Sequence, residues 1–322
     1  MMLFNARTLR AVLPISECVQ AMRQVFVDTA EGGYHAPVRS RVRPPGDSPN
    51  GMTLMPTLRL RQPRRWCLKQ MVVTPDNSAR GLDPLQGLVV LQDGDDGRVL
   101  AVADAPALTT LRTAATSALA TLTFARNDAR RVAIIGTGVQ GRTHIEAMRA
   151  ILPGAQIRLW GRSAPKATEL ARETQCEPMP TIEQAVCDAD VICTVTASHD
   201  PILRREWLAP GCHVNAVGSS TPVACEIEPA LMAASRLFVD RRDAALAESG
   251  DVRRALAEGA ITEQHIQAEL GDVLLGRHAG RTSAEEITLY KSLGFGALDL
   301  GAIELALLNA SARGLGTAVP WA

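Results

Sequence analysis

The chain has 322 residues, and its 34 lysines and arginines balance 34 aspartates and glutamates. This length predicts two domains or one large elaborated α/β domain. A net charge of zero provides no general attraction for phosphate backbones, and four Trp, two Tyr and five Phe offer few rings for base stacking, so we expect no nucleic-acid partner. The sequence contains no apolar run near the roughly 18 residues of a membrane span, so no membrane association is expected.

The N-terminal segment lacks the features of a secretory signal, which predicts a cytoplasmic location. The seven cysteines include no CxxC pair, so we expect them to be reduced thiols of the core. The six histidines do not have the spacing of metal ligands, so no metal site is predicted.

In chain order, the first element is a helix over residues 14–30 that Ser16 could cap. Short extended segments follow, with a hairpin turn at residues 92–97, and they predict an antiparallel sheet. The expected strands are residues 52–60, 66–73, 85–92 and 99–102.

The next helix is expected to begin at Thr109 or Thr110 and to link two domains. After it, strands and helices alternate, and Thr181 with Gln184 forms a capping box. This alternation predicts a doubly wound parallel sheet, and a last helix over residues 297–312 is expected to return to the first domain. The expected parallel strands are residues 131–135, 157–160, 191–196, 213–217 and 237–240.

A glycine-rich motif follows the first of these strands and opens a helix. Gly136 permits a tight turn, Gly138 lets the backbone approach a pyrophosphate, and Gly141 allows the helix to pack on the strand. Because strand, glycines, helix and second strand stand in the order of one βαβ unit, we predict a dinucleotide site. Its loop residues are Gly136, Thr137, Gly138, Val139, Gln140 and Gly141.

The second strand of this unit ends in Gly161-Arg162-Ser163. NAD-binding chains carry a carboxylate here, which accepts hydrogen bonds from the ribose hydroxyls. Arg162 and Ser163 instead offer charge and donors for a 2′-phosphate. We therefore predict NADP(H), with NAD(H) as the alternative.

Three cations of the first domain, Arg39, Lys69 and Arg112, lie in apolar or ordered contexts, where a cation needs an anionic partner. Either each pairs with a carboxylate of the protein, or together they hold a carboxylate ligand. Spacing alone does not choose between the two.

Several separated motifs resemble those of the ornithine cyclodeaminase and mu-crystallin family, in the same order. The resemblance implies a homodimer in which a Rossmann domain, residues 113–297, is inserted into a smaller α+β substrate-binding and dimerisation domain, residues 1–112 and 298–322. The motifs are MTLMP (52–56), LTTLRTAATSA (108–118), IIGTGVQG (134–141), NAVGSSTP (215–222), AALAESGD (244–251) and LYKSLG (289–294).

The resemblance also implies that Arg39, Lys69 and Arg112 bind the substrate carboxylate beside the nicotinamide. Met52 of the MTLMP motif is assigned to the same substrate site. Further coenzyme contacts are assigned to Thr196, Gly218 and Lys291, and Asp299 in the last helix is a further candidate.

One position differs from the cyclodeaminase pattern. Cyclodeaminases of this family carry an aspartate where this chain has Ser220, and a serine cannot replace a carboxylate as general base at neutral pH. The ketimine reductases similar to mu-crystallin have serine at this position. We therefore predict reduction of a cyclic ketimine carboxylate, Δ1-piperideine-2-carboxylate or Δ1-pyrroline-2-carboxylate, to L-pipecolate or L-proline, with Lys69, Arg112 and Ser220 as the catalytic residues.

Three alternatives remain open. An amino-acid dehydrogenase that makes alanine or an N-alkyl amino acid is the first, because its substrates pass through an imine carboxylate that the same three cations could hold. An ornithine cyclodeaminase is the second, and a non-catalytic NADP(H)-binding protein of the crystallin type is the third.

Overall fold

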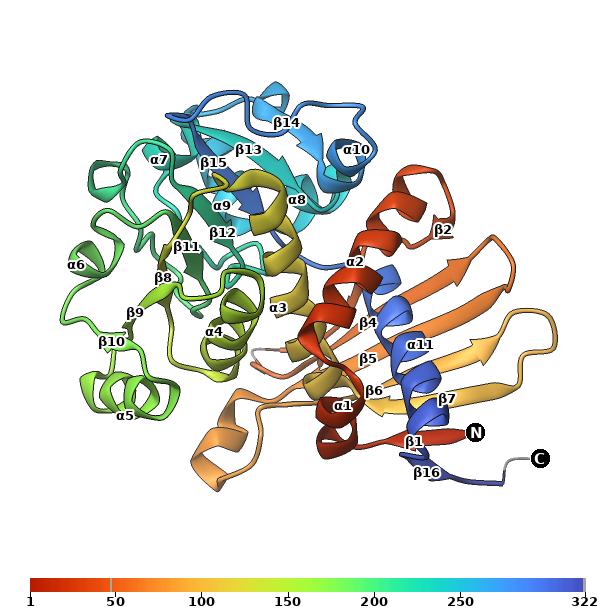
Figure 1. Ribbon diagram of the computed structural model, residues 1–322. Helices are drawn as coiled ribbons and strands as arrows, with labels where there is room; N and C mark the ends of the chain where they lie inside the picture. Colours follow the sequence, from red (N-terminus) through yellow and green to blue (C-terminus); the bar gives the residue numbers. More distant parts are fainter. Residues whose placement is uncertain (47, 321–322) are drawn as a thin grey trace. The chain divides into compact units, whose positions relative to one another are not determined.

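The computed structural model describes residues 1–46 and 48–320 and forms two compact units (Figure 1). The first unit comprises Met1–Thr113 and Gly294–Ala322, and the second comprises Ala114–Leu293. The chain thus passes between the units at 113/114 and at 293/294, whereas the motifs suggested 112/113 and 297/298.

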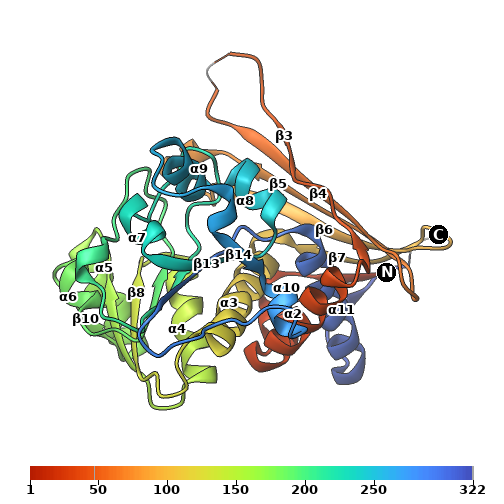
Figure 2. The ribbon, with the colours of Figure 1, turned by 90° about the horizontal axis from the view of Figure 1, so that it is seen from above.

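The sheet of the first unit has the order β16-β1-β7-β6-β5-β4-β2, with β3 also paired to β4. Its neighbouring strands are antiparallel except for β1 and β7, which are parallel. Figure 2 shows β3 running beside β4. The strands are β1 (Met2–Phe4), β2 (Tyr34–His35), β3 (Ser40–Val42), β4 (Gly51–Arg59), β5 (Arg65–Val73), β6 (Leu85–Asp93), β7 (Val99–Asp104) and β16 (Thr317–Ala318).

Helices cover one face of this sheet. In Figure 1, α2 and α11 lie side by side, and α11 packs on β4, β5 and β6. The expected helices over residues 14–30 and 297–312 are confirmed by α2 and α11, and the expected hairpin turn lies between β6 and β7. Helix α1 was not predicted. The helices are α1 (Ala6–Val12), α2 (Ile15–Ala30), α11 (Gly296–Arg313), the short 3-10 helix η1 (Pro75–Arg80) and the first part of α3 (Ala105–Phe124).

One expected cap and one expected helix start are wrong. Helix α2 has the predicted limits to within one residue, but Pro14, not Ser16, is its N-cap, and Pro14 makes no side-chain cap. Helix α3 begins at Ala105 rather than at Thr109 or Thr110, because the Asp104 carboxylate accepts a hydrogen bond from the Ala107 N–H at 2.8 Å.

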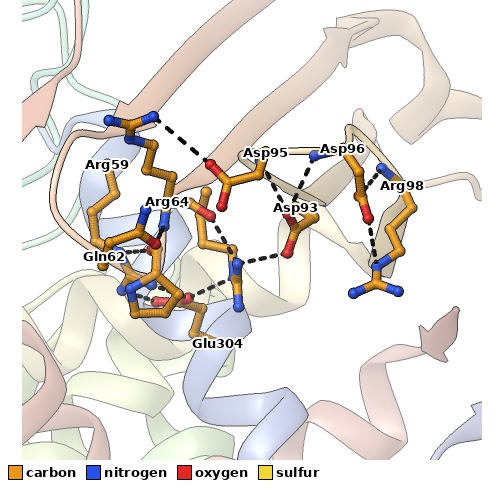
Figure 3. A network of polar contacts seen from close by, with 10 residues as sticks. Arg59, Gln62, Arg64, Asp93, Asp95, Asp96, Arg98 and Glu304 are labelled. Atoms are coloured by element: carbon orange, nitrogen blue, oxygen red, sulfur yellow. Dashed lines mark hydrogen bonds and ion pairs between the residues drawn. The ribbon is translucent and has the colours of Figure 1, made fainter.

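Helix α11 is fixed to the sheet by Glu304. Its carboxylate accepts two hydrogen bonds from Arg59, at 2.5 and 2.7 Å, and its Oε1 lies 3.5 Å from Nε of Arg65. Arg65 also binds Asp93 at 2.9 Å, so the network extends to the turn between β6 and β7 (Figure 3). Bidentate arginine–carboxylate pairs define orientation as well as distance, so this network sets the position of α11 on the sheet.

The second unit is a parallel sheet of eight strands with the order β10-β9-β8-β11-β12-β15-β13-β14. The strand order reverses at β8, as in a doubly wound Rossmann fold, which confirms the predicted fold class. Strand β15 was not predicted, because it overlaps the LYKSLG motif (289–294), which was interpreted as a functional segment. The strands are β8 (Arg131–Ile135), β9 (Gln156–Trp160), β10 (Glu177–Pro178), β11 (Val191–Thr194), β12 (His213–Ala216), β13 (Ser235–Val239), β14 (Ile266–Glu269) and β15 (Ile287–Lys291).

The Thr181 cap is confirmed, since its hydroxyl accepts a hydrogen bond from the Gln184 N–H at 3.1 Å. The remaining helices of this unit are α4 (Val139–Ile151), α5 (Ala164–Thr174), α6 (Ile182–Val186), α7 (Pro229–Ala233), α8 (Arg242–Glu248), α9 (Gly250–Ala257), α10 (Leu270–Leu274) and the short η2 (Arg205–Trp207) and η3 (Glu263–His265). Across residues 1–46 and 48–320, none of the helices combines the length and the apolar character needed to cross a membrane.

Candidate coenzyme and carboxylate sites

The glycine-rich loop has the geometry that a phosphate group requires. Gly136 has φ +133°, which side-chain-bearing residues rarely adopt, and a Cβ at Gly141 would lie 2.1 Å from the Gly136 carbonyl oxygen. Gly138 is the N-cap of α4, and apart from its two chain neighbours no described residue has an atom within 4 Å of where its Cβ would be. The loop is therefore tightly packed on one side and open at the helix N-terminus, where unpaired N–H groups favour an anion.

The other expected coenzyme residues lie at the same edge of this sheet. Thr196 follows the end of β11, Gly218 follows β12, and Lys291 is the last residue of β15. The carboxyl ends of parallel strands line the crevice where doubly wound sheets bind ligands, and the strand order reverses beside the loop after β8. The second unit thus brings these residues to the edge that would hold a dinucleotide.

Arg162 and Ser163 follow β9, and both are exposed. Ser163 is the N-cap of α5 but makes no side-chain capping bond, so its hydroxyl is not used by the helix. Thr137 of the phosphate loop packs against this segment, because a Cβ at Gly161 would lie 2.3 Å from the Thr137 methyl group. The segment that carries Arg162 and Ser163 therefore adjoins the glycine-rich loop at Gly161.

A buried glutamate ties two strand ends together. Oε1 of Glu226 accepts hydrogen bonds from N and Oγ1 of Thr196, each at 2.7 Å. Its Oε2 accepts from Gly218 N at 2.7 Å and from Thr194 Oγ1 at 2.9 Å. Burial and the neighbouring Asp251 raise the pKa of Glu226. Four donors on one carboxylate fix the backbone after β11 and β12.

Lys291 does not extend a free charge into the expected coenzyme site. Its side chain is fully buried, and its Nζ lies 3.0 Å from Oδ2 of Asp251, which is also fully buried. Oδ1 of Asp251 accepts hydrogen bonds from the N–H groups of Glu226 and Ile227, at 2.7 and 3.0 Å. Lys291 is thus part of a buried ion pair whose aspartate binds the backbone of residues 226 and 227. Ser220, in the loop after β12, is only partly buried.

The first unit places two of the three cations, Lys69 and Arg112, on one carboxylate, that of Asp299. Nζ of Lys69 lies 2.8 Å from Oδ2 of Asp299, and Nε of Arg112 lies 3.1 Å from its Oδ1. All three side chains are buried, with exposures of 4% for Lys69 and Arg112 and 0% for Asp299. The sequence left open whether each cation pairs with a carboxylate of the protein. Lys69 and Arg112 do so, with Asp299.

Gly294 holds the arginines together. Its φ is +73°, and a Cβ there would lie 2.5 Å from Nη1 of Arg112, so the guanidinium packs directly on the glycine. Its carbonyl oxygen accepts a hydrogen bond from Nη2 of Arg39 at 3.0 Å. We call Arg39, Lys69, Arg112 and Asp299 the clamp. It comprises three cationic side chains and one carboxylate.

The electrostatics of the clamp follow from this arrangement. Burial lowers the pKa of Lys69 to about 8, Asp299 acts in the opposite direction, and Arg112 and Arg39 add to the decrease. Burial works against the charged form of Asp299, but Lys69 and Arg112 outweigh it and hold the pKa of this carboxyl below its ordinary value. Lys69, with a pKa of about 8, is therefore easier to deprotonate than an exposed lysine, whereas Asp299 stays ionised.

Met52 is not brought to the clamp. In the regular register of β4 and β5, Met55 lies opposite Lys69 and Met52 lies opposite Val72. Because side chains alternate along a strand, Met52 is on the sheet face opposite to Lys69.

His144 is a buried, packed residue whose ring nitrogens lie 2.9 Å from Ser117 Oγ and 2.8 Å from the Gln140 carbonyl oxygen. In the described part of the chain, no group of three or more His, Cys, Asp or Glu side chains is placed to hold a metal ion.

Comparison with known proteins places this arrangement in a family. The family model of the ornithine cyclodeaminase/mu-crystallin family matches residues 1–313. The chain belongs to this family. It is 40% identical to ketimine reductase mu-crystallin of Mus musculus over 222 residues, 68% of each chain. It is 34% identical to Delta(1)-pyrroline-2-carboxylate reductase of Paracoccus denitrificans over 238 residues, 72% of this chain and 75% of that protein.

A solved structure of the same family extends the similarity to the whole chain. Thermococcus litoralis Delta(1)-pyrroline-2-carboxylate reductase in complex with NADH and L-proline matches with a TM-score of 0.92 and 28% identity. The match covers 99% of this chain and 100% of that one.

Two acids that are buried in the structure, Glu226 and Asp251, received no predicted role from the sequence. Glu226 stands between two apolar residues in Cys225-Glu226-Ile227, and such an isolated acid in an apolar segment is a signal of a buried hydrogen-bonded carboxylate. Asp251 closes the AALAESGD motif, but nothing in the sequence links it to Lys291.

Proposed function

We propose that this protein is a nicotinamide-dependent reductase of cyclic ketimine carboxylates, acting on Δ1-pyrroline-2-carboxylate or Δ1-piperideine-2-carboxylate. The observation that carries the proposal is the clamp, in which Lys69 and Arg112 are held by one carboxylate and Arg39 by the Gly294 carbonyl oxygen. Two guanidinium groups and an ammonium group that lie close together offer charge-assisted donors for a small carboxylate. The names of the related reductases support this substrate class.

The coenzyme is proposed to bind along the carboxyl edge of the second unit. Gly136, Gly138 and Gly141 would hold the pyrophosphate, because the loop is open at Gly138 and closed behind it. We propose NADP(H) as the preferred form, since Arg162 and Ser163 offer donors to a 2′-phosphate and no carboxylate follows β9 directly. NAD(H) remains the alternative, supported by the NADH in the Thermococcus litoralis complex.

The reaction adds hydride to the carbon of the C=N bond and a proton to its nitrogen, giving the cyclic amino acid. The bound reduced coenzyme supplies the hydride. Arg39 and Arg112 hold the substrate carboxylate and fix its orientation. Lys69 is the proposed proton source, because an ammonium group with a pKa of about 8 is still mostly protonated at neutral pH. Ser220 is proposed to hydrogen-bond to the imine nitrogen.

The alternative functions differ in what they require of Ser220. A cyclodeaminase needs a general base at this position, and a hydroxyl group does not serve as one at neutral pH. An amino-acid dehydrogenase that works through an imine needs only the clamp and the coenzyme, so it is the second candidate.

A homodimer is proposed to form through the open face of the first sheet. This face carries a continuous apolar row across four strands, and Trp66 and Leu88 on it are 47% and 52% exposed. Apolar surface of this kind marks a protein interface. The cross-strand row is Pro56, Leu68, Val90 and Val102. Leu68→Glu is expected to produce monomers in light-scattering chromatography, and a dimer of unchanged stability would contradict this interface.

One assay panel separates these functions. Wild-type protein is incubated with NADPH or NADH and either a preformed ketimine carboxylate or pyruvate plus ammonia, and separately with L-ornithine and oxidised coenzyme. The proposal predicts that coenzyme oxidation is fastest with the ketimine and that L-proline or L-pipecolate accumulates. Faster turnover of pyruvate plus ammonia would make the protein an alanine dehydrogenase, and ammonia released from ornithine would make it a cyclodeaminase.

A further inference from the structure

The last helix contributes a carboxylate to the centre of the clamp. Asp299 lies in the first turn of α11 and is completely buried, although Lys69 comes from β5 and Arg112 from α3. Each oxygen of the carboxylate contacts a different cation, Oδ2 at 2.8 Å from Lys69 Nζ and Oδ1 at 3.1 Å from Arg112 Nε. The carboxylate therefore connects the two groups that are proposed to hold the substrate and to supply its proton.

The position of Asp299 is fixed from both sides along the helix. At the start of α11, a Cβ at Gly296 would lie 2.0 Å from Thr57 Oγ1, so only glycine allows this approach of the helix to β4. Further along, Glu304 is held by Arg59 at 2.5 and 2.7 Å (Figure 3). Asp299 is placed between these two contacts, in the helix turn where the dipole favours a negative charge.

We propose that Asp299 is the positioning residue of the clamp: it keeps the Lys69 ammonium group protonated and orients the Arg112 guanidinium. This inference rests on the proposed function, in which protonated Lys69 serves the substrate. Asp299 does not contact the substrate in this account and acts only through the two cations. The acid is needed because burial, and then the charges of Arg112 and Arg39, favour the neutral form of Lys69.

Several charged and titratable groups act on this pair. Arg112 from α3 and Arg39 from the segment before β3 oppose the charge of Lys69, and Asp299 from α11 favours it. Cys67 lies two residues before Lys69 on β5, and burial raises the pKa of its thiol well above the ordinary value, so it stays neutral. Glu304 is the other acid of α11, and it is paired with arginines outside the clamp.

Asp299→Asn removes the charge and keeps the shape. In this variant the pKa of Lys69 is expected to fall by about 1 to 3 pH units, the usual effect of losing an adjacent opposite charge. The chain contains only three lysines, Lys69, Lys166 and Lys291, so protein labelled with ¹³C at lysine Cε gives few signals in an NMR titration. Lys69→Met identifies the Lys69 signal by its loss, with Lys69→Arg as the second choice if that variant does not fold.

The matched control is Asp76→Asn, the same change of charge at an exposed aspartate of the first unit that lies outside the clamp. The inference predicts that the Lys69 midpoint falls in Asp299→Asn and stays near the wild-type value in Asp76→Asn. The second readout is the pH profile of ketimine turnover. The pH at which turnover is half lost on the alkaline side should be lower in Asp299→Asn than in the wild type, and unchanged in the control. A Lys69 midpoint that is unchanged in Asp299→Asn, or that falls equally in both variants, overturns the inference.

The titration needs no substrate, so the two proposals fail separately. A wild-type protein that turns over no ketimine contradicts the proposed function and leaves the NMR result to decide the role of Asp299. If Asp299→Asn does not fold, Asp299→Glu replaces it. The longer side chain keeps the charge and moves the carboxylate, so the Lys69 midpoint should stay high while the Michaelis constant for the ketimine rises severalfold. A lower midpoint in this variant contradicts the inference.

Discussion

Replacing Glu226 by glutamine tests how strongly one buried carboxylate holds the coenzyme edge of the second unit. The carboxylate accepts four hydrogen bonds, two on each oxygen, and each oxygen serves one backbone N–H, that of Thr196 or that of Gly218. A glutamine amide has one oxygen and one NH2 group. In either orientation, the NH2 group faces a backbone N–H that has lost its acceptor, while the threonine hydroxyl beside it can rotate.

The loss can be estimated from these contacts. An unsatisfied buried donor costs about 1–3 kcal/mol, and the remaining hydrogen bonds lose the strength that a charged acceptor gives them. We expect Glu226→Gln to lower the free energy of unfolding of this unit by about 3 kcal/mol. At roughly 2–4 °C per kcal/mol for a domain of this size, Tm falls by about 6–12 °C.

The assay is thermal unfolding followed by circular dichroism, with urea unfolding as a second measurement. Glu263→Gln is the control, because Glu263 is an exposed glutamate of the same unit. If Glu226→Gln lowers Tm by no more than the control, the four hydrogen bonds do not hold the strand ends, and the reasoning about this carboxylate is refuted.

Three further predictions follow from single observations. Gly138→Val fills the open space at the start of α4 and should weaken coenzyme binding in calorimetry at least about tenfold with Tm unchanged, whereas equal affinity would show that the coenzyme does not bind there. Arg162→Ala should raise the Michaelis constant for NADPH by about 10- to 150-fold and leave that for NADH unchanged; equal effects on both would remove the argument for the 2′-phosphate. Burial lowers the pKa of His144 to about 4 and that of His213 to about 3, below the unfolded value of 6.5, so the unfolded state binds more protons as pH falls. The urea midpoint should therefore decrease progressively below pH 6.5, and a midpoint independent of pH from 7.5 to 5 would contradict this.

The sequence predicted the strand before the glycine-rich loop and the helix after it accurately, because the information is local. Strand β8 has the expected limits of 131–135, since four buried apolar residues run directly into Gly136. Glycine spacing and apolar runs act within one βαβ unit and do not depend on the rest of the chain. The start of α3 was less predictable, because the signal came from Asp104 at the end of a strand and not from the helical periodicity.

The pairings of the clamp could not be predicted in this way. Asp299 lies 187 positions after Arg112 in the sequence, and no periodicity connects residues of such separation. The sequence identified the cations by their apolar surroundings but left open what neutralises them. Met52 shows the same limit, because a motif suggested its role and only the strand register shows that it lies on the opposite sheet face from Lys69.

The central claim is that the clamp recognises the carboxylate of a cyclic imine. The most direct measurement compares kcat/KM of the wild-type protein for Δ1-pyrroline-2-carboxylate with kcat/KM for Δ1-pyrroline, the same ring without the carboxylate, at saturating NADPH. Two charge-assisted contacts of about 1.5–3 kcal/mol each, from Arg39 and Arg112, predict that the carboxylate improves kcat/KM at least about a hundredfold. Similar values for the two compounds would show that Arg39 and Arg112 do not hold the substrate.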